Sequence, residues 1–363
     1  MKGIAKKAIS VAGKVPGVDR LLWHGAAFLE GAGNDYLSHE WQARNVFGQF
    51  TDEHGNDINL IDGLRNRIKP GWEAMLAPPS EPVLPGSAAV EARLNSWRDK
   101  LSHVSDFLDC RGFGLDGKDV LEIGSYDGAT ACVLAEAGAS SVTGIDMAAY
   151  YINQTADESV NRESIERKNA ELTALRDRYR DAIGDSRQRV IFREDDICQS
   201  EIENESQDMV FSWEVMEHVG EPRTSFEQMY RMLRPGGLAF HEYNPFFSID
   251  GGHSLCTLDF LWGHARLSDD DFSRYLDIHR PEEKALSLSF FHNNLNRMTL
   301  ADLHSAVHET GFQALEVLPW SRRNHLELLD RAALQQCTRL YPTATATDLV
   351  SPIVWLLLQK PVS

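Results

Sequence analysis

Between Lys118 and Met147 the hydrophobic positions form a short apolar run, then a helical repeat, then a second apolar run. The run from Val120 to Ile123 lacks the alternation of an exposed sheet and is typical of a buried parallel strand. From Thr130 to Ala137 the apolar side chains follow helical spacing, and the second apolar run ends at Asp146. The pattern therefore predicts a strand, a glycine turn, a helix and a second strand.

The same kind of pattern continues through the rest of the chain. Five further apolar runs predict strands at residues 189–192, 208–213, 238–242, 311–317 and 353–359. Helical periodicity is predicted for residues 87–113, 153–187 and 299–308. Strands that alternate with helices in this way indicate an α/β fold with a seven-stranded, mostly parallel sheet.

Two long segments interrupt this α/β pattern, and a third precedes it. We expect residues 1–86 to be a mainly helical N-terminal extension, because aromatic residues are spread among its charges and prolines at 78–85 break regular structure after it. Residues 87–363 would then form the α/β domain, with a charged helical insertion at 152–188. A second insertion at 244–297 is expected to act as a substrate lid, since insertions of that length in compact domains are usually functional.

The net charge and the cysteine spacing disfavour some classes of function. The chain has 363 residues, of which 36 are basic and 54 acidic, so its net charge is -18. Such a charge repels nucleic acid and anionic membranes, and it disfavours a nucleic-acid substrate. The five cysteines show no paired spacing, which predicts reduced thiols, a cytoplasmic protein and no zinc site; they are Cys110, Cys132, Cys198, Cys256 and Cys337.

The first residues carry a basic, partly apolar segment. Residues 1–15 could form an amphipathic helix that lies on a membrane surface, although such a segment more often packs on its own protein. The apolar run after Lys7 is interrupted by Ser10, Gly13 and Lys14, so it does not resemble a signal peptide. No stretch reaches membrane-spanning length.

The glycine turn limits which ligand can bind above it. Gly124 and Gly128 bracket the turn, where glycine permits positive φ and close approach to the main chain. A dinucleotide fingerprint needs glycine at the third and sixth positions of the turn, but Tyr126 and Ala129 stand there. A nucleoside ligand without a pyrophosphate is therefore expected, with Asp146 placed to accept ribose hydroxyls. The simpler alternative is an α/β turn that binds no nucleotide.

Four ordered motifs between residues 115 and 243 carry a family resemblance. They are Glu-x-Gly-x-x-x-Gly from Glu122, the later acid Asp146, Ser-x-Glu-Val-x-Glu-His from Ser212, and Leu-Arg-Pro-Gly-Gly from Leu233. Together they resemble class I S-adenosylmethionine (SAM)-dependent methyltransferases of the type 11-like group. The resemblance implies a Rossmann-like sheet with helices on both faces and an antiparallel last strand. It also implies SAM as cofactor and a methyltransferase activity.

The resemblance also assigns cofactor-binding positions. Glu122, Gly124 and Gly128 would shape the methionine and ribose pocket, together with Ser125 and Tyr126. Tyr126 departs from the family, which usually has glycine there. The remaining positions are the ribose-binding Asp146 with Met147, the adenine-binding Asp196 and Ile197 with Asp195 as the alternative, and Trp213 at the end of the fourth strand.

Two histidines are candidates for the base that removes an acceptor proton. His218 follows the fourth strand, at the sheet edge where open α/β folds bind ligands. His253 follows two glycines in the expected lid. Each histidine has a structural alternative, because position alone does not establish a perturbed pKa. His264, in Leu-Trp-Gly-His, is a weaker candidate of the same kind.

A divalent metal is a second way to activate an acceptor. Glu214, Glu217 and His218 would share one face if a helix began there, and such a set can hold magnesium or a similar ion. The spacing is similar to that of metal-using ubiquinone-pathway and small-RNA 2'-O-methyltransferases. Metal-free members also carry the Glu-His pair, so a metal is not favoured. The alternative is a helix N-terminus with favourable acids.

The insertion at 244–297 suggests the acceptor. Its phrases with Phe, Trp, Asn and His are similar to inserts in methyltransferases encoded near glycan-building enzymes, and they would suit a sugar ring. We therefore expect O-methylation of a small molecule or glycan. The alternatives are a metal-assisted RNA 2'-O-methyltransferase and a non-catalytic SAM-fold subunit that binds a partner, with a pocket obstructed through Tyr126. Most of the aromatic residues in the insertion are also compatible with a simple core role.

Overall fold

The computed structural model describes residues 37–76, 84–151 and 158–362. The chain divides into two units, residues 1–45 and 46–363, and each is described by itself. In the first unit, helix α3 (His39–Arg44) begins at Ser38, whose hydroxyl accepts a hydrogen bond from the Trp41 N–H at 3.2 Å. The amphipathic helix predicted at residues 1–15 and most of the proline-rich linker lie outside the described residues.

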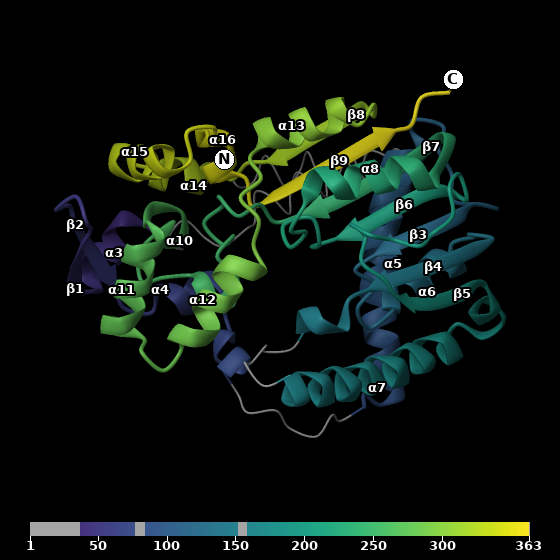
Figure 1. The fold of residues 1–363 in the computed structure, drawn as a ribbon, viewed down its shortest axis with the longest axis horizontal. Helices are drawn as coiled ribbons and strands as arrows, with labels where there is room; N and C mark the ends of the chain where they lie inside the picture. The colour runs from purple at the N-terminus through teal and green to yellow at the C-terminus, as the bar shows by residue number, and fades with distance from the viewer. Residues whose placement is uncertain (1–36, 77–83, 152–157, 363) are drawn as a thin grey trace, which may run out of the picture. The chain divides into compact units, whose positions relative to one another are not determined.

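A seven-stranded sheet organises the second unit (Figure 1). Its order is β5-β4-β3-β6-β7-β9-β8. Strand β9 runs antiparallel to both of its neighbours, whereas the pairs from β5 to β7 are parallel. The predicted sheet with an antiparallel last strand is confirmed. The strands are β3 (Asp119–Ile123), β4 (Ser141–Asp146), β5 (Val190–Glu194), β6 (Gln207–Trp213), β7 (Leu233–Tyr243), β8 (Gln313–Trp320) and β9 (Ile353–Gln359).

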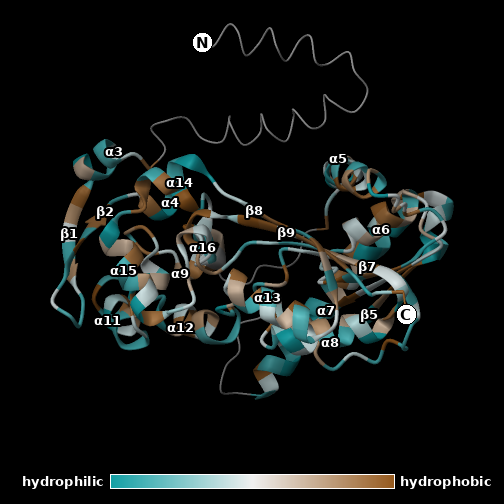
Figure 2. Cartoon of the chain, turned by 90° about the horizontal axis from the view of Figure 1, so that it is seen from above, coloured by the Kyte–Doolittle hydropathy of each residue, from teal (hydrophilic) through white to brown (hydrophobic). Residues whose placement is uncertain are grey.

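Helices cover both faces of this sheet and close two hydrophobic cores. One core joins the sheet to α5 (Ser87–Asp109), α6 (Ala129–Glu136) and the buried Tyr179 of α7 (Glu158–Ala182). The other joins it to α8 (Pro222–Met232) and α13 (Leu300–Glu309). Figure 2 shows hydrophobic residues along β8 and β9; those of β9 are mostly buried, whereas β8, at the edge of the sheet, is only partly buried.

The described part of the N-terminal region combines short helices with a hairpin that the sequence pattern did not predict. It contains an antiparallel hairpin of β1 (Val46–Thr51) and β2 (Asp57–Ile61), followed by α4 (Leu64–Ile68) and the 3₁₀ helix η1 (Trp72–Leu76). Burial alternates along the first four residues of β2, which is the period of a half-buried strand. The Asp52 carboxylate closes the turn by accepting from the N–H groups of His54 and Asn56.

The insertion after β7 folds into four helices: α9 (His253–Cys256), α10 (Gly263–Arg266), α11 (Asp269–His279) and α12 (Lys284–Asn293). A second helical segment, which the sequence pattern did not predict, lies between β8 and β9. It contains α14 (Arg323–Leu328), α15 (Arg331–Leu340) and α16 (Ala346–Val350). Trp262 donates to the Leu349 carbonyl at 2.9 Å, and Arg266 donates to Gln336 at 2.7 Å. These bonds join the two segments, and we call residues 244–297 and 321–352 together the cap.

Two further features bear on the sequence expectations. The five cysteines, all within the described residues, carry unpaired thiols. In the part of the chain that the structure describes, none of the helices is long and apolar enough to cross a membrane.

Candidate active site

The candidate site lies at the carboxyl edge of the sheet, where the strand order reverses. Strands β4 and β5 lie on one side of β3, while β6 and β7 lie on the other. Parallel strands on both sides bring their carboxyl ends to the same edge. In open α/β sheets this switch point is where ligands bind. The loop after β3 and the turn after β6 therefore face each other across it.

The loop after β3 requires glycine at its first position. Gly124 has a φ of +71°, and a Cβ built there would lie 2.2 Å from Cγ2 of Val215. The N–H groups of Gly124 and Ser125 both donate to the Ile145 carbonyl of β4, at 2.9 and 3.0 Å. The loop is thus tied to β4 while the turn after β6 packs directly on its backbone. Gly128, at a φ of +83°, ends the loop against Phe192 and Arg176.

Tyr126 takes the position where the family usually has glycine. Its φ is +40°, in the left-handed region that is uncommon for a residue with a Cβ. Its N–H donates to the Asp146 carboxylate, and its carbonyl accepts from Arg176 of α7 at 2.9 Å. The ring is 37% exposed, and the Lys168 ammonium lies 5.5 Å from its centre. The tyrosine therefore turns its ring toward α7.

Asp146 stands at the tip of β4, as the sequence predicts. Its carboxylate accepts from Tyr126 and, at 2.7 Å, from the N–H of Met147. The Met147 side chain is 43% exposed. Asp146 thereby connects the ends of β3 and β4, next to the glycine loop.

Among the described residues, two buried polar atoms beside the loop have no hydrogen-bond partner. They are Oε2 of Glu122 and the hydroxyl of Ser125. Burial, together with the charge of Asp127, raises the pKa of Glu122 well above its ordinary value. A buried polar group without a partner is costly, and a ligand that brings donors would relieve this cost. SAM carries an ammonium group and ribose hydroxyls, so the residues present fit it.

The other predicted cofactor residues follow β5 and β6. Asp195 accepts from the Ser200 hydroxyl at 2.7 Å, and Asp196 accepts from the Cys198 N–H at 2.9 Å. Ile197 is buried beside them. Trp213 is also buried but belongs to the core on the α5 side, where its ring lies 5.7 Å from that of Trp97. These residues lie along the same sheet edge as Asp146.

The turn after β6 differs from the sequence prediction. Residues 214–218 form a turn, so Glu214, Glu217 and His218 do not share a helix face. Glu214 has a φ of +55°, and its N–H continues the sheet by donating to the Glu242 carbonyl at 2.7 Å. Glu214 itself therefore lies in a left-handed conformation bound to the neighbouring strand, and residues 214–218 continue as a turn instead of a helix. The predicted metal set that includes Glu214 therefore has no helical basis.

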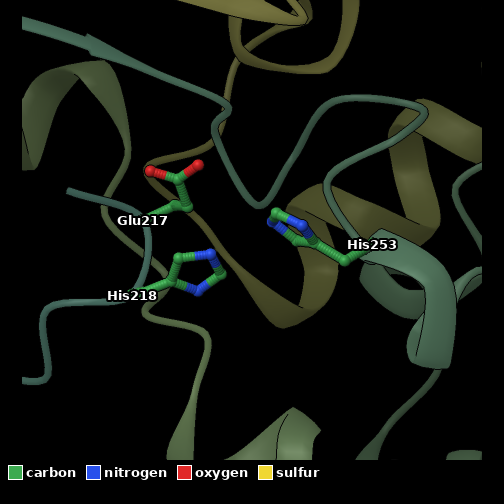
Figure 3. Close-up of side chains that lie close together, drawn as sticks. All are labelled: Glu217, His218 and His253. Atoms are coloured by element: carbon green, nitrogen blue, oxygen red, sulfur yellow. The ribbon is translucent and has the colours of Figure 1, made fainter. Parts of the chain in front are cut away.

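His253 of the cap joins Glu217 and His218 instead. Each of these three residues offers one ligand atom, and these atoms all lie within 4.8 Å of one another. Figure 3 shows Glu217 and His218 on one turn, with the His253 ring across from them. The centres of the two imidazole rings are 4.7 Å apart. The structure thus brings together both predicted catalytic histidines, and we call these three residues the Glu-His-His cluster.

The two imidazoles differ in their hydrogen bonding. Nδ1 of His218 lies 2.6 Å from the Asn294 carbonyl, which can only accept, so this nitrogen carries the proton and Nε2 keeps its lone pair. Nε2 of His253 is buried and has no hydrogen-bond partner in the part of the chain that the structure describes. Burial lowers the pKa of His218 to about 4 and that of His253 well below its ordinary value. Both rings are therefore neutral near pH 7.

Glu217 has the opposite electrostatic behaviour. It is 1% exposed, and burial raises its pKa to about 8. One carboxylate oxygen accepts from the Asn244 N–H at 3.2 Å, while Oε2 is buried and has no hydrogen-bond partner within residues 37–76, 84–151 and 158–362. The site therefore contains a carboxyl group that is poorly solvated next to two uncharged imidazoles.

The sequence reasoning missed several residues around the cluster. The Tyr150 ring lies 4.9 Å from that of His218 and comes from η2 (Ala148–Tyr151), directly after Asp146. Because β3 separates β4 from β6, Tyr150 reaches across the glycine loop. Asn296 donates to the carbonyls of Met216 and Val219 at 2.6 and 2.9 Å. Of these residues, only Tyr150 could have been expected near the site from the sequence, because it follows the tip of the second strand.

His264 does not join the cluster. Its ring is buried, and Nε2 lies 2.7 Å from the Phe246 carbonyl. A Cβ at Gly252 would lie 2.7 Å from Nδ1 of His264. This histidine therefore packs beneath the glycines that precede His253, which is a structural role.

The fold and this site define a class I SAM-dependent methyltransferase. The sheet order, the glycine loop and the acid at the tip of β4 lie together at the switch point. Residues 91–317, more than half of the chain, match the family described as a methyltransferase domain. The chain belongs to this methyltransferase family, and SAM is its cofactor.

Solved structures with a similar fold are distant in sequence. A SAM-dependent methyltransferase from Mesorhizobium loti is 14% identical, with 68% of this chain and 93% of that chain covered and a TM-score of 0.40. A Haloferax volcanii complex of the Trm112 methyltransferase activator with a putative methyltransferase is 15% identical, with 75% of this chain and 96% of that chain covered and a TM-score of 0.41. Phosphoethanolamine N-methyltransferase 2 from Haemonchus contortus is 20% identical, with 80% of this chain and 56% of that chain covered and a TM-score of 0.40. Among curated proteins, none matches this sequence.

Proposed function

We propose that this methyltransferase methylates a hydroxyl group of a small molecule or a sugar, and that the Glu-His-His cluster activates that hydroxyl. The observation that carries the proposal is the pair of neutral imidazoles at the switch point. Nε2 of His218 keeps its lone pair, and Nε2 of His253 is buried without a partner. A neutral amine can react through its own lone pair, whereas a hydroxyl benefits from a base that removes its proton.

Bound SAM supplies a methyl group on a sulfonium, which is already a good electrophile. The protein must hold the acceptor oxygen in line, exclude water and remove its proton. The S–CH₃ bond breaks as the O–CH₃ bond forms, and the hydroxyl proton passes to Nε2 of His253 or His218. The low pKa of both imidazoles makes each a modest base, so the proton moves as the O–C bond forms.

The aromatic residues of the cap support a small acceptor. Most are core residues: Phe246, Phe247, Phe260, Trp262, Tyr275 and Phe291 are each at most 3% exposed. Phe290 is only partly buried, and its ring centre lies 6.1 Å from His218 and 6.0 Å from His253. One ring beside two imidazoles would provide a platform the size of a single sugar or aromatic ring.

The cofactor would lie along the carboxyl edge beside this cluster. Gly124, Ser125 and Glu122 would surround its methionine part, and Asp146 would bind the ribose hydroxyls. Asp196 and Ile197, with Asp195 as the alternative, would contact the adenine. The segment 244–297 would act as the lid, because it contributes His253 and Asn294 to the site.

Two alternatives predict different behaviour. An RNA 2'-O-methyltransferase needs a basic groove, and the net charge of -18 speaks against it. A non-catalytic SAM-fold subunit predicts a cofactor pocket blocked at Tyr126. The outward turn of the Tyr126 ring toward Lys168 favours an open position there.

The test combines cofactor binding with acceptor screening. Calorimetry should show one SAM site that weakens sharply in Asp146→Ala. The full chain with methyl-labelled SAM should then label hydroxyl acceptors such as monosaccharides, nucleotide sugars or phenols. His253→Gln and His218→Gln should each lower kcat by about 10²-fold or more while SAM affinity is retained. His292→Gln, which alters a half-exposed histidine of α12 outside the cluster, is the matched control.

Three results would contradict the proposal. Labelling confined to amine acceptors would remove the need for the base. Undiminished kcat in both histidine variants would remove the cluster from the reaction. Absence of SAM binding would favour the non-catalytic alternative.

A further inference from the structure

We propose that Glu217, His218 and His253 bind one divalent transition-metal ion. The three ligand atoms lie within 4.8 Å of one another, from two segments that are separate in the sequence. Two imidazoles and one carboxylate are a known ligand set for such ions, with coordination positions left for a substrate. The set differs from the sequence prediction because His253 replaces Glu214.

The unpartnered atoms of the cluster point to a missing positive ligand. Glu217 is 1% exposed, yet its Oε2 has no hydrogen-bond partner. Nε2 of His253 is likewise buried and unpartnered. Within the described residues, neither atom is satisfied by another protein group. One cation between them would satisfy a carboxylate oxygen and an imidazole lone pair together.

His218 already has the arrangement of a metal ligand. Metal-binding histidines usually donate their other ring N–H to a carboxylate or a backbone carbonyl, which sets the tautomer and the ring orientation. Nδ1 of His218 makes this bond to Asn294 at 2.6 Å. Asn296 holds the carbonyls on either side of Glu217 and His218, those of Met216 and Val219. The ligands on this turn are therefore preorganised.

The third ligand is held by the cap. Next to His253, the Ser254 carbonyl accepts from Arg65 at 2.8 Å. Lys69, whose charge acts on the cluster residues, pairs with Asp250 at a distance of 3.9 Å between Nζ and Oδ2. This pairing offsets the lysine charge that would otherwise oppose a cation. The surrounding charges therefore permit an ion beside Glu217.

The ligand chemistry favours a borderline cation over magnesium or calcium. Mg²⁺ and Ca²⁺ prefer oxygen ligands, whereas imidazole suits Zn²⁺, Fe²⁺ and neighbouring ions. Mn²⁺ and Co²⁺ accept the same mixed set and can be followed spectroscopically. We therefore assign the site to this group of ions and use Mn²⁺ and Co²⁺ as probes.

The role of the ion rests on the O-methylation proposed above, whereas its binding does not. A bound cation lowers the pKa of a hydroxyl that coordinates it, and the released proton passes to solvent. With the ion bound, the two imidazoles coordinate it instead of accepting the proton, and the ion activates the acceptor oxygen. The oxygen then forms the O–CH₃ bond as the S–CH₃ bond breaks.

The first experiment measures metal binding to the full, metal-free chain. Calorimetric titration with Mn²⁺ or Co²⁺ should show one ion per chain. Glu217→Gln and His253→Gln should each weaken binding by at least about tenfold. His292→Gln, which alters a half-exposed histidine of α12 outside the cluster, should bind as the unmodified chain does. Equal affinity in all three variants, or an equal loss in the control, would overturn the site.

A second measurement does not depend on variants that fold poorly. Pulsed electron paramagnetic resonance of the Mn²⁺-loaded chain should show ¹⁴N coupling from two imidazoles, and an absence of nitrogen coupling would overturn the assignment.

SAM titration of the same samples separates the metal site from the proposed methyltransferase reaction. A chain that binds the metal but not SAM contradicts the methyltransferase reaction and supports the metal site. Hydroxyl methylation that is unchanged by metal removal overturns the catalytic role of the ion.

Discussion

Three of the six non-glycine residues with positive φ in the described part of the chain belong to the site. Tyr126, Glu214 and His253 have φ values of +40°, +55° and +50°, although none is glycine. Such conformations cost about 1–3 kcal/mol each and persist where the surrounding structure fixes them. The Asp146 carboxylate holds Tyr126, and the Glu242 carbonyl holds Glu214. The strain supports a functional role for the loop, the turn and the first residue of α9.

Gly124→Ala tests the close contact between the loop and the turn. The alanine would need a left-handed φ, which costs about 1–2 kcal/mol, and its Cβ would overlap Val215. Overpacking adds about 1–3 kcal/mol. We expect chemical denaturation to show a loss of several kcal/mol, and SAM titration to show at least about tenfold weaker binding, which is about 1.4 kcal/mol.

Gly117→Ala is the matched control for that substitution. Its φ is +70°, almost the same as that of Gly124, but no atom lies within 4 Å of its built Cβ. It should therefore lose only the conformational part of the stability and keep SAM affinity. Adding Val215→Ala to Gly124→Ala should restore part of the stability. Equal losses in the two single variants would show that the contact with Val215 has no influence.

At the scale of elements, a buried ion pair fastens the short helix α9 into the cap. Arg65 of α4 makes one hydrogen bond to Glu283 at 2.9 Å and an ion-pair contact with it at 2.8 Å, and both side chains are 4% exposed. The same guanidinium donates to Ser254 of α9. A four-residue helix has little stability of its own. The position of His253 therefore depends on these contacts.

Arg65→Met should leave the Glu283 charge buried and unpaired, at a cost of about 3–5 kcal/mol in the free energy of unfolding. The double variant Arg65→Met, Glu283→Leu should recover most of that loss, because no buried charge remains. Urea denaturation measures both. The exposed pair Arg323–Glu327 is the control, and Arg323→Met should change stability by less than about 1 kcal/mol. A double variant as unstable as the single variant would contradict this account.

The stability of the whole molecule should depend on acid through its buried neutral histidines. His241 is fully buried beside Ser212, and burial lowers its pKa to about 3. The unfolded chain binds a proton at this residue below its ordinary pKa near 6.5, whereas the folded chain does not. The stabilising contribution is therefore complete above pH 6.5 and is lost as the pH falls toward 3. Its slope reaches about 1.4 kcal/mol per pH unit.

Glu217 acts in the opposite direction, because its raised pKa makes the folded chain hold a proton between pH 4.5 and 8. Comparing the stability of the unmodified chain with that of a His241 variant at each pH cancels the contribution of Glu217. His241→Asn keeps a polar atom near Ser212 but cannot titrate, so its stability should fall less steeply from pH 6.5 to 4. Urea denaturation across that range measures the two slopes. Parallel curves would contradict a neutral, buried His241.

The main strands and the cofactor loop could be predicted from the sequence because their signals are local. Apolar runs and glycine spacing reflect burial and backbone angles within a few residues. Asp146 follows directly from its place at the end of β4. The β1–β2 hairpin and the helices α14–α16 were missed, because their short, mixed patterns acquire meaning only through contacts such as Trp262 with Leu349.

By itself, the sequence determined the α/β fold, the SAM-binding loop and His218 as a candidate base. Only the tertiary structure decided the membership of the Glu-His-His cluster. His253 reaches Glu217 and His218 because the insertion after β7 folds back over the sheet edge, where Asn294 and Asn296 bond to the turn. Glu214 leaves the predicted set because its N–H bonds to Glu242 and its backbone is left-handed. Contacts between distant segments depend on chain packing, which local periodicity does not encode.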